Sequence, residues 1–132
     1  MIVVDTSALI AMLLNEPERR KFADAIKKAQ QALVSSATIV EARMVAYGKG
    51  GPERVRVLDG IIESLGLQII PLGIEEIEIA HSAFVTYGKG NGHPAQLNFG
   101  DLFSYALAKS RGVPLLFKGD DFALTDVGVA VG

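Results

Sequence analysis

The chain has no cysteine among its 132 residues. It therefore has no disulfide framework, no zinc–thiolate site, no iron–sulfur cluster and no thiol nucleophile. A reduced, cytoplasmic compartment fits this composition. Long hydrophobic runs are also missing, since the longest, residues 8–14, is far shorter than the ~20 residues that a transmembrane helix needs. The N-terminus has no basic segment ahead of its apolar residues, so we expect no signal peptide and no membrane partner.

An excess of basic charge is the next absence. The chain has 13 basic and 15 acidic side chains, which gives a net charge of −2. A phosphate-bearing partner must therefore bind a local patch and not the whole surface. Apolar residues make up 49% and charged residues 21% of the chain, close to the average soluble protein. The length fits a single domain, which we expect to span residues 1–132.

Short apolar runs alternate with helical patterns along the whole chain. Runs at 2–4, 32–35, 67–72 and 113–117 predict strands, and 127–131 predicts a short fifth strand. Amphipathic patterns between them predict about six helices, one of which ends at glycines 48–51 before another starts at Pro52. This alternation favours an α/β fold, a three-layer α/β/α sandwich around a parallel five-stranded sheet. Pro71 places the third strand at an edge.

Carboxylates lie where these strands end. Asp5 directly follows the first strand, and Asp120 and Asp121 follow the fourth. Glu41 lies early in the helix after the second strand, and Asp101 lies in the first turn of the helix that leads to the fourth. Ligands of open parallel sheets bind beyond the carboxyl ends of the strands. We therefore expect these acids at one edge of the sheet.

The acids point to a metal site. Neither Glu41 nor Asp101 has a cationic residue three or four positions away on its helix. Several carboxylates in one cleft repel each other, and a divalent cation relieves the repulsion. Oxygen ligands suit Mg²⁺ or Mn²⁺. Each acid also has a simple structural alternative, because Asp5 can cap a helix, Glu41 can be a solvated charge, and the others suit first-turn or turn positions.

Four segments together resemble the PIN-domain ribonucleases. They are MIVVDTSAL at the start, IVEA at 39–42, NFGDLFSYALAK at 98–109 and LLFKGDDF at 115–122. The resemblance is greatest to the VapC toxins of type II toxin–antitoxin pairs, and it spans nearly the whole chain. It implies a sheet ordered 3-2-1-4-5 and a Mg²⁺- or Mn²⁺-dependent endoribonuclease that arrests translation.

The resemblance also implies roles for individual residues. Asp5, Glu41 and Asp101 are the expected catalytic and metal-binding carboxylates. The fourth acid is Asp120 or Asp121, and we favour Asp120, with Asp121 capping the segment that follows.

Three further residues are secondary candidates. By analogy, Thr6 or Ser7 holds a metal-bound water or orients Asp5. Lys118 adjoins the acidic turn, where its charge can face an RNA phosphate.

Partners follow from the same resemblance. It implies a VapB-type antitoxin, an RNA substrate and a second copy of the chain in a homodimer. The antitoxin is expected to lie in the groove between the first helices and the helix at 37–47, and to present a basic side chain to the acids. DNA binding is expected from the antitoxin and not from this chain.

Other functions fit the residues less well. A haloacid-dehalogenase phosphatase needs a second aspartate two positions after Asp5, where this chain has Ser7. A response-regulator receiver needs an aspartate at the end of the third strand, where this chain has Pro71 and Leu72. The remaining alternative is a catalytically inactive PIN-like module that binds protein or RNA. We expect His81 and His93 to be structural.

Overall fold

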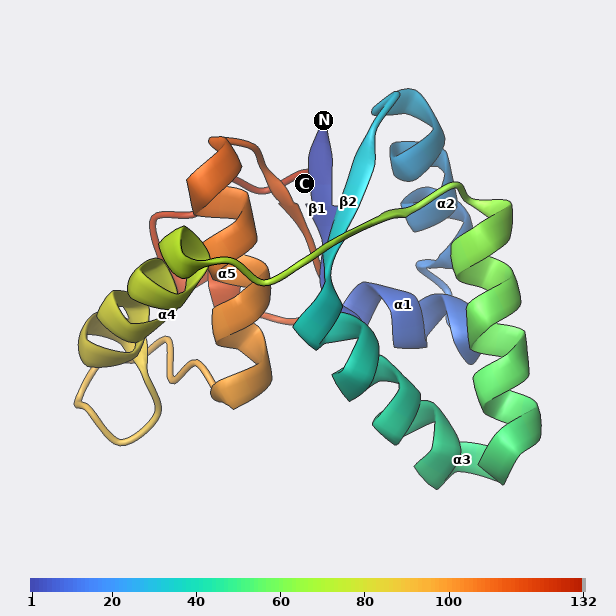
Figure 1. The fold of residues 1–132 in the computed structure, drawn as a ribbon, viewed down its shortest axis with the longest axis horizontal. Helices are drawn as coiled ribbons and strands as arrows, with labels where there is room; N and C mark the ends of the chain where they lie inside the picture. Colours follow the sequence, from blue (N-terminus) through green and yellow to red (C-terminus); the bar gives the residue numbers. More distant parts are fainter. Residues whose placement is uncertain (132) are drawn as a thin grey trace.

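Four short parallel strands form the centre of the molecule, of which the structure, a computed structural model, describes residues 1–131 (Figure 1). The strands are β1 (Ile2–Val4), β2 (Ala32–Ser35), β3 (Gln68–Ile70) and β4 (Leu115–Leu116). They are hydrogen-bonded in the order β3-β2-β1-β4. The predicted parallel sheet and the order of these four strands are confirmed, with β3 at the edge.

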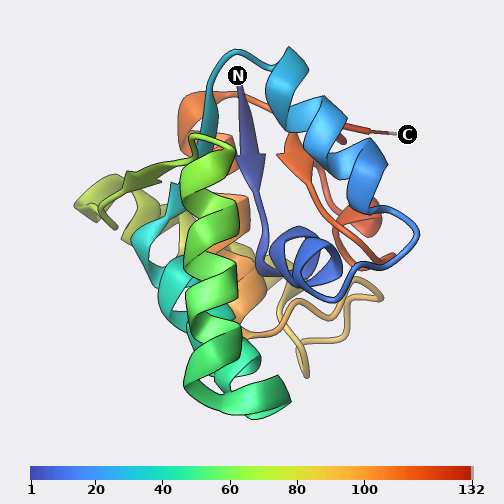
Figure 2. The ribbon, with the colours of Figure 1, turned by 90° about the vertical axis from the view of Figure 1, so that its right-hand side faces the viewer.

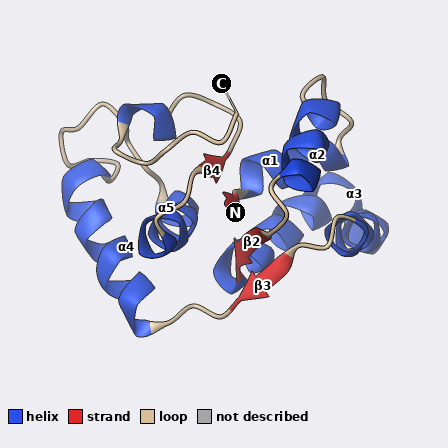
Figure 3. Ribbon diagram, turned by 90° about the horizontal axis from the view of Figure 1, so that it is seen from above, coloured by secondary structure: helices blue, strands red, loops and turns tan. Residues whose placement is uncertain are grey.

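Helices cover both faces of the sheet. The helices α1 (Thr6–Leu13), α2 (Arg19–Lys28) and α3 (Ser36–Ser64) lie on one side of the strands. The helices α4 (Ile74–Tyr87) and α5 (Phe99–Arg111) lie on the other side, as Figure 3 shows from above. A short 3₁₀ helix, η1 (Phe122–Leu124), follows β4. No helix in this described part of the chain is long and apolar enough to span a membrane.

Side chains of the strands alternate between two cores. In β1, Ile2 and Val4 pack with the helices α1 to α3, whereas Val3 packs with α4 and α5. The same alternation places Val34 and Leu33 of β2 in different cores. Successive residues of a strand point to opposite faces, and here both faces are covered. This is why β1 is apolar throughout and β2 is apolar up to its last residue, Ser35.

The long helix α3 is two helical arms joined at a sharp break. Gly50 and Gly51 have non-helical backbone angles, and the φ of 70° at Gly51 favours glycine. Pro52 then begins the second arm. Arg43 of the first arm pairs with Asp59 of the second at 3.1 Å, and Figure 2 shows the two arms side by side. The sequence prediction of one helix ending at these glycines and another starting at Pro52 is confirmed.

The predicted fifth strand is wrong as a regular strand. Residues 127–131 form a single bridge, between Val129 and Leu115, with hydrogen bonds from Leu115 N to Gly128 O and from Ala130 N to Leu115 O. The cause is the shortness of β4, which has only two residues before the chain leaves the sheet and bends at residues 118–120. A two-residue partner offers too few backbone groups for a ladder, so the sheet has four strands within residues 1–131.

Candidate active site

Asp5 lies at the carboxyl end of β1, where it is the N-cap of α1 and only 2% exposed. Its Oδ2 accepts hydrogen bonds from the backbone N of Ser7 at 3.0 Å and from Ser7 Oγ at 2.7 Å. Its Oδ1 accepts one from Ser104 Oγ of α5 at 2.5 Å. Burial raises the pKa of Asp5, although these hydrogen bonds oppose the shift. Asp5 is therefore a helix cap and at the same time a buried acid held by neutral donors.

Glu41 reaches the same region from α3. Its Oε1 accepts a hydrogen bond from Thr6 Oγ1 at 2.5 Å. The carboxylate lies over the first turn of α5, at Gly100. A Cβ atom on Gly100 would lie only 1.8 Å from Glu41 Oε2. The glutamate can occupy this place because residue 100 has no side chain.

Asp101 faces these two acids from the first turn of α5. It takes part in a capping box, in which Asp101 Oδ2 accepts from Asn98 N and Asn98 Oδ1 accepts from Asp101 N, both at 2.9 Å. Burial, together with the charges of Asp5, Asp121 and Glu41, raises the pKa of Asp101 to about 7, against the opposing effect of the hydrogen bond from Asn98. Four carboxylates contributed by four parts of the chain therefore act on one another.

The acids repel one another, and the donors of the hydrogen bonds to Asp5, Glu41 and Asp101 are neutral groups. In the conformation seen here, the carboxylates do not surround a common point: no three acidic or histidine side chains among the described residues lie close enough to hold one metal ion. Asp5 is fixed by its serines and Asp101 by its capping box, whereas one flexible side chain, Glu41, lies aside over Gly100. The donor set, made of oxygens alone and strongly negative, suits a divalent cation.

The turn after β4 brings two further acids to the edge. Of these, Asp121 is the acid whose charge contributes to raising the pKa of Asp101, after the larger effects of burial and of Asp5. Asp121 precedes η1, but its side chain makes no capping hydrogen bond, contrary to the expectation that it caps this segment. Asp120, the residue that the sequence favoured, lies in the same turn, and both aspartates are exposed.

The secondary candidates have separate partners. Ser7 orients Asp5, and its Oγ also accepts a hydrogen bond from Lys118 N at 3.0 Å. Thr6 holds Glu41. The ammonium of Lys118 pairs with Glu16 and Glu18, each at 3.3 Å, so its charge is neutralised by two acids of the loop between α1 and α2.

The sequence did not predict the roles of two buried hydroxyls, those of Ser104 and Thr38, or of one glycine, Gly100. Ser104 is fully buried and links Asp5 to Thr38 Oγ1, which lies 3.3 Å from Ser104 Oγ. The signal for it was a serine one turn after Asp101 on an otherwise apolar face of α5. Gly100 gave no signal, because its role depends on where Glu41 lies. His93, in contrast, is a structural residue as expected, because its Nδ1 accepts from Ala95 N and its ring packs against Tyr87.

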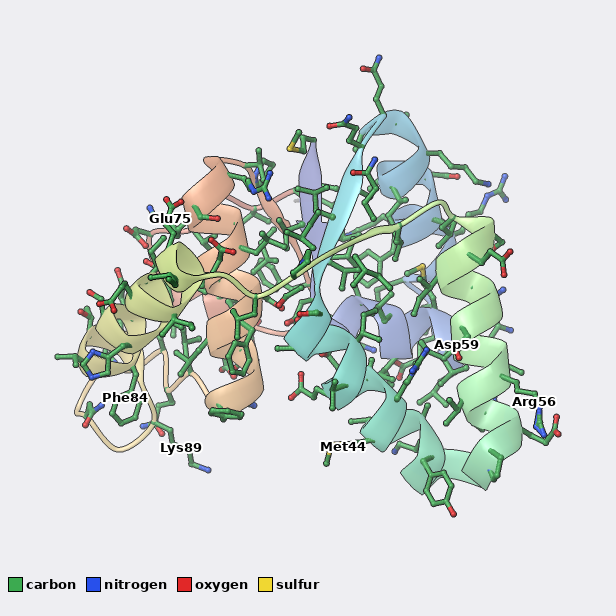
Figure 4. The ribbon with its side chains drawn as sticks, viewed as in Figure 1. Met44, Arg56, Asp59, Glu75, Phe84 and Lys89 are labelled. Carbon is green, nitrogen blue, oxygen red and sulfur yellow. The ribbon has the colours of Figure 1, made fainter. Side chains whose placement is uncertain are left out.

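A groove with a volume of 580 Å³ opens beside Glu41. Its walls are the first arm of α3 and the start of α5. Most of its lining is apolar: Ala37, Val40, Met44, Phe99 and Phe103 surround the polar Glu41 and Asn98. The side chain of Met44 projects from α3 at this surface (Figure 4). An extended ligand in this groove would thus have one end at the acids.

Comparison with known proteins identifies relatives over nearly the full length. The sequence matches the PIN domain family over residues 2–128. It is 41% identical over 126 residues to Ribonuclease VapC30 of Mycobacterium tuberculosis, which covers 96% of this chain and 95% of the relative. The fold is similar to that of Mycobacterium tuberculosis VapC20, described as a sarcin–ricin loop cleaving toxin, with a TM-score of 0.74, 16% identity and 96% of each chain covered. It is also similar to a toxin–antitoxin complex from Klebsiella pneumoniae, with a TM-score of 0.61, 22% identity, and 93% of this chain and 91% of that chain covered.

Proposed function

The chain belongs to the PIN-domain family and, within it, to the VapC ribonuclease toxins. We propose that it hydrolyses RNA at the cluster of Asp5, Glu41, Asp101 and Asp121, which is called the acidic cleft below. The observation that carries the proposal is the cluster around Asp101, whose pKa is raised to about 7 by burial and by three neighbouring carboxylates. Repelling acids in one cleft are costly for folding and are typical of functional sites. A structural role alone would not require them.

We assign Asp5, Glu41, Asp101 and Asp121 as the carboxylates that hold Mg²⁺ or Mn²⁺. Asp121 replaces Asp120 in this proposal because its charge acts on Asp101. The prediction of Asp120 from the sequence is untested, and comparing the cleavage activity of Asp120→Asn and Asp121→Asn decides between the two residues. When bound, such an ion lowers the pKa of a water and neutralises charge on a phosphate.

The hydrogen bonds around the acids suggest how they divide the work. Asp5 has both oxygens fixed by serine donors, so it is the most rigid ligand. Glu41 has Oε1 engaged by Thr6, which leaves Oε2 free to accept a proton from an attacking water. Ser7 and Thr6 hold these two acids in place and do not contact the reacting phosphate in this proposal.

The experiment is 5′-end sequencing of total RNA after incubation with the purified chain. We expect one or a few cuts that need Mg²⁺ or Mn²⁺, that disappear with chelator, and that Asp101→Asn abolishes. An asparagine at this position can still accept from Asn98 N, so α5 keeps its cap. Glu75→Gln, which removes an exposed carboxylate from the start of α4 (Figure 4), is the matched control. A folded, antitoxin-free chain that makes no cuts would refute the proposal.

The apolar groove beside Glu41 fits the antitoxin. Met44 is 70% exposed and Phe99 is 77% exposed, which is unusual for large apolar side chains in a protein that works alone. We propose that an antitoxin segment places apolar side chains against them and a basic side chain near the acids. Met44→Glu is expected to release the antitoxin in a pull-down and to leave the fold intact. If Met44→Glu captures as much antitoxin as the wild type does, the antitoxin binds at another surface.

The outer face of α4 fits a second copy of the chain. Ile74, Ile77 and Phe84 are exposed there, and Ile77 and Phe84 line a 310 Å³ hollow with Phe99 and Phe103. We propose that this face forms the homodimer. Phe84→Glu, compared with Val57→Glu on α3, is expected to yield a monomer in light scattering. A dimer that persists in this variant would exclude the α4 face.

A further inference from the structure

Three residues of α5 form one stripe along the helix. Asp101, Tyr105 and Lys109 are spaced by four positions, so their side chains follow one another on the same side. Asp101 belongs to the acidic cleft. The other two both contact Asp126, which follows η1: Tyr105 donates from its hydroxyl to Asp126 Oδ1 at 2.5 Å, and Lys109 Nζ lies 3.0 Å from Oδ2.

The segment between Asp121 and Asp126 is a compact turn. Leu124 N donates to Asp121 O at 3.3 Å, and Phe122 O accepts from the N and the Oγ1 of Thr125. Phe122 is buried, and its ring centroid lies 5.1 Å from that of Phe117. An element closed by its own hydrogen bonds and anchored by a buried ring moves as one unit. Its two ends, Asp121 and Asp126, are thus linked mechanically.

The other side of the acidic turn is also anchored. Lys118 N donates to Ser7 Oγ at 3.0 Å, and the same hydroxyl donates to Asp5. The two acids of the turn therefore lie between one anchor at Asp5 and another at Tyr105. The first anchor contacts Asp5 itself, and the second, Tyr105, lies one helical turn after Asp101 on α5.

We propose that the Tyr105–Asp126 hydrogen bond, supported by Lys109, is a clamp that fixes the acidic turn against α5 and so positions Asp121 opposite Asp101. Tyr105 and Asp126 are positioning residues in this inference, which rests on the proposed metal-dependent nuclease. The clamp is needed because Asp121 and Asp101 repel each other, and repulsion alone would drive the turn outward. Held in place, the fourth acid is ready before the ion arrives.

The chemistry of the clamp supports a permanent contact. Burial and the hydrogen bond to Asp126 raise the pKa of Tyr105, and this hydrogen bond together with Lys109 lowers the pKa of Asp126. At neutral pH the tyrosine is therefore a donor and the aspartate an ionised acceptor. Hydrogen bonds to a charged acceptor are stronger than neutral ones.

The test compares Tyr105→Phe with Tyr87→Phe in the full chain. Both changes remove one hydroxyl from the same aromatic cluster, where the two rings lie 5.8 Å apart, but only the first breaks the contact with Asp126. Two readouts apply: Mn²⁺ affinity by calorimetry without RNA, and amide hydrogen exchange over residues 119–127 in the metal-free protein. For Tyr105→Phe we expect roughly tenfold weaker Mn²⁺ binding and faster exchange in this segment. For Tyr87→Phe we expect wild-type values.

A second pair of variants keeps the test independent of the core. Asp126 is exposed, so Asp126→Ala leaves the buried residues untouched and is expected to match Tyr105→Phe. Asp126→Asn retains an oxygen for the tyrosine and is expected to lie closer to wild type. If the wild type binds Mn²⁺ and both clamp variants bind it equally well, the clamp is refuted and the nuclease proposal stands. A wild type that neither binds Mn²⁺ nor cuts RNA would overturn both.

Discussion

A single methyl group at position 100 is expected to disable the cleft without removing any of its acids. The carboxylate of Glu41 occupies the space that a side chain of residue 100 would need: a Cβ atom there would lie 1.8 Å from Oε2, 2.3 Å from Cδ and 2.5 Å from Oε1. Carbon contacts become comfortable only at about 3.5 Å, so in Gly100→Ala the nearest oxygen must retreat by about 1.5 Å or more. The movement also strains the bond that Oε1 accepts from Thr6.

The fold is expected to tolerate this change. The atoms in the way are the end of a flexible side chain and not backbone, and residue 100 lies in the first turn of α5. Alanine is a better helix former than glycine by up to about 1 kcal/mol. The free energy of unfolding should therefore stay the same or rise slightly. Misplacing a catalytic group by about 1 Å can cost roughly 100-fold in rate, and a loss of this order is expected here.

The assay measures RNA cleavage and urea unfolding of Gly100→Ala beside Gly60→Ala. A Cβ at Gly60, in the second arm of α3, meets no atom within 4 Å, so this control carries the same chemical change at an open helical position. It should keep full activity. A Gly100→Ala protein that is folded and as active as wild type would show that the glutamate need not lie over α5, and the role assigned to Glu41 would be wrong.

Three more predictions concern the charges and their donors. The pKa of Asp101 is about 7 in the folded chain and 3.8 in the unfolded reference, so between these pH values the folded chain holds a proton that the unfolded chain has lost. The free energy of unfolding should therefore fall as pH rises from about 4 to 7, and it should fall less in Asp101→Asn. Mn²⁺ binding, measured by calorimetry, should be about tenfold weaker at pH 6 than at pH 8, because the metal competes with this proton. Ser104→Ala removes the buried donor to Asp5 Oδ1 and should cost about 1–3 kcal/mol in urea unfolding, a loss that Ser110→Ala on the same helix should not reproduce. Lys118→Met should leave the cleavage rate within about twofold of wild type, because its ammonium is paired with Glu16; a larger loss would place this charge at the RNA.

The sequence predicted the elements well where local rules decide them. Glycines 50 and 51 followed by Pro52 mark the break in α3, and the apolar strands mark a sheet covered on both faces. The acids could be placed at one edge because the carboxyl ends of parallel strands meet there. The fifth strand failed because its formation depends on the length of its partner, and apolar character at 127–131 says nothing about how soon β4 ends.

The finer parts of the site depend on contacts between distant segments. The residue that holds Asp5 from α5, Ser104, is 99 positions away in the chain, and the one that leaves room for Glu41, Gly100, is 59 positions away (100 − 41). No local pattern encodes such distances. The choice between Asp120 and Asp121 is of the same kind, since it depends on which carboxylate the turn directs towards Asp101.

The donors around the cleft explain how a cluster of acids can remain ready for a cation. The contacts that fix Asp5, Glu41 and Asp101 come from serine, threonine and backbone groups, which orient a carboxylate but leave its charge in place. Two basic side chains are paired with other acids: Lys118 with Glu16 and Glu18, and Arg43 with Asp59. An arginine or lysine within the cleft would stabilise the fold by pairing with the acids, but it would compete with the metal. Neutral donors do not cancel the charges of the acids, so the acids still repel one another and the pKa of Asp101 is raised. A basic residue supplied by an antitoxin would act in the opposite direction, because it would neutralise the cleft only while the partner is bound.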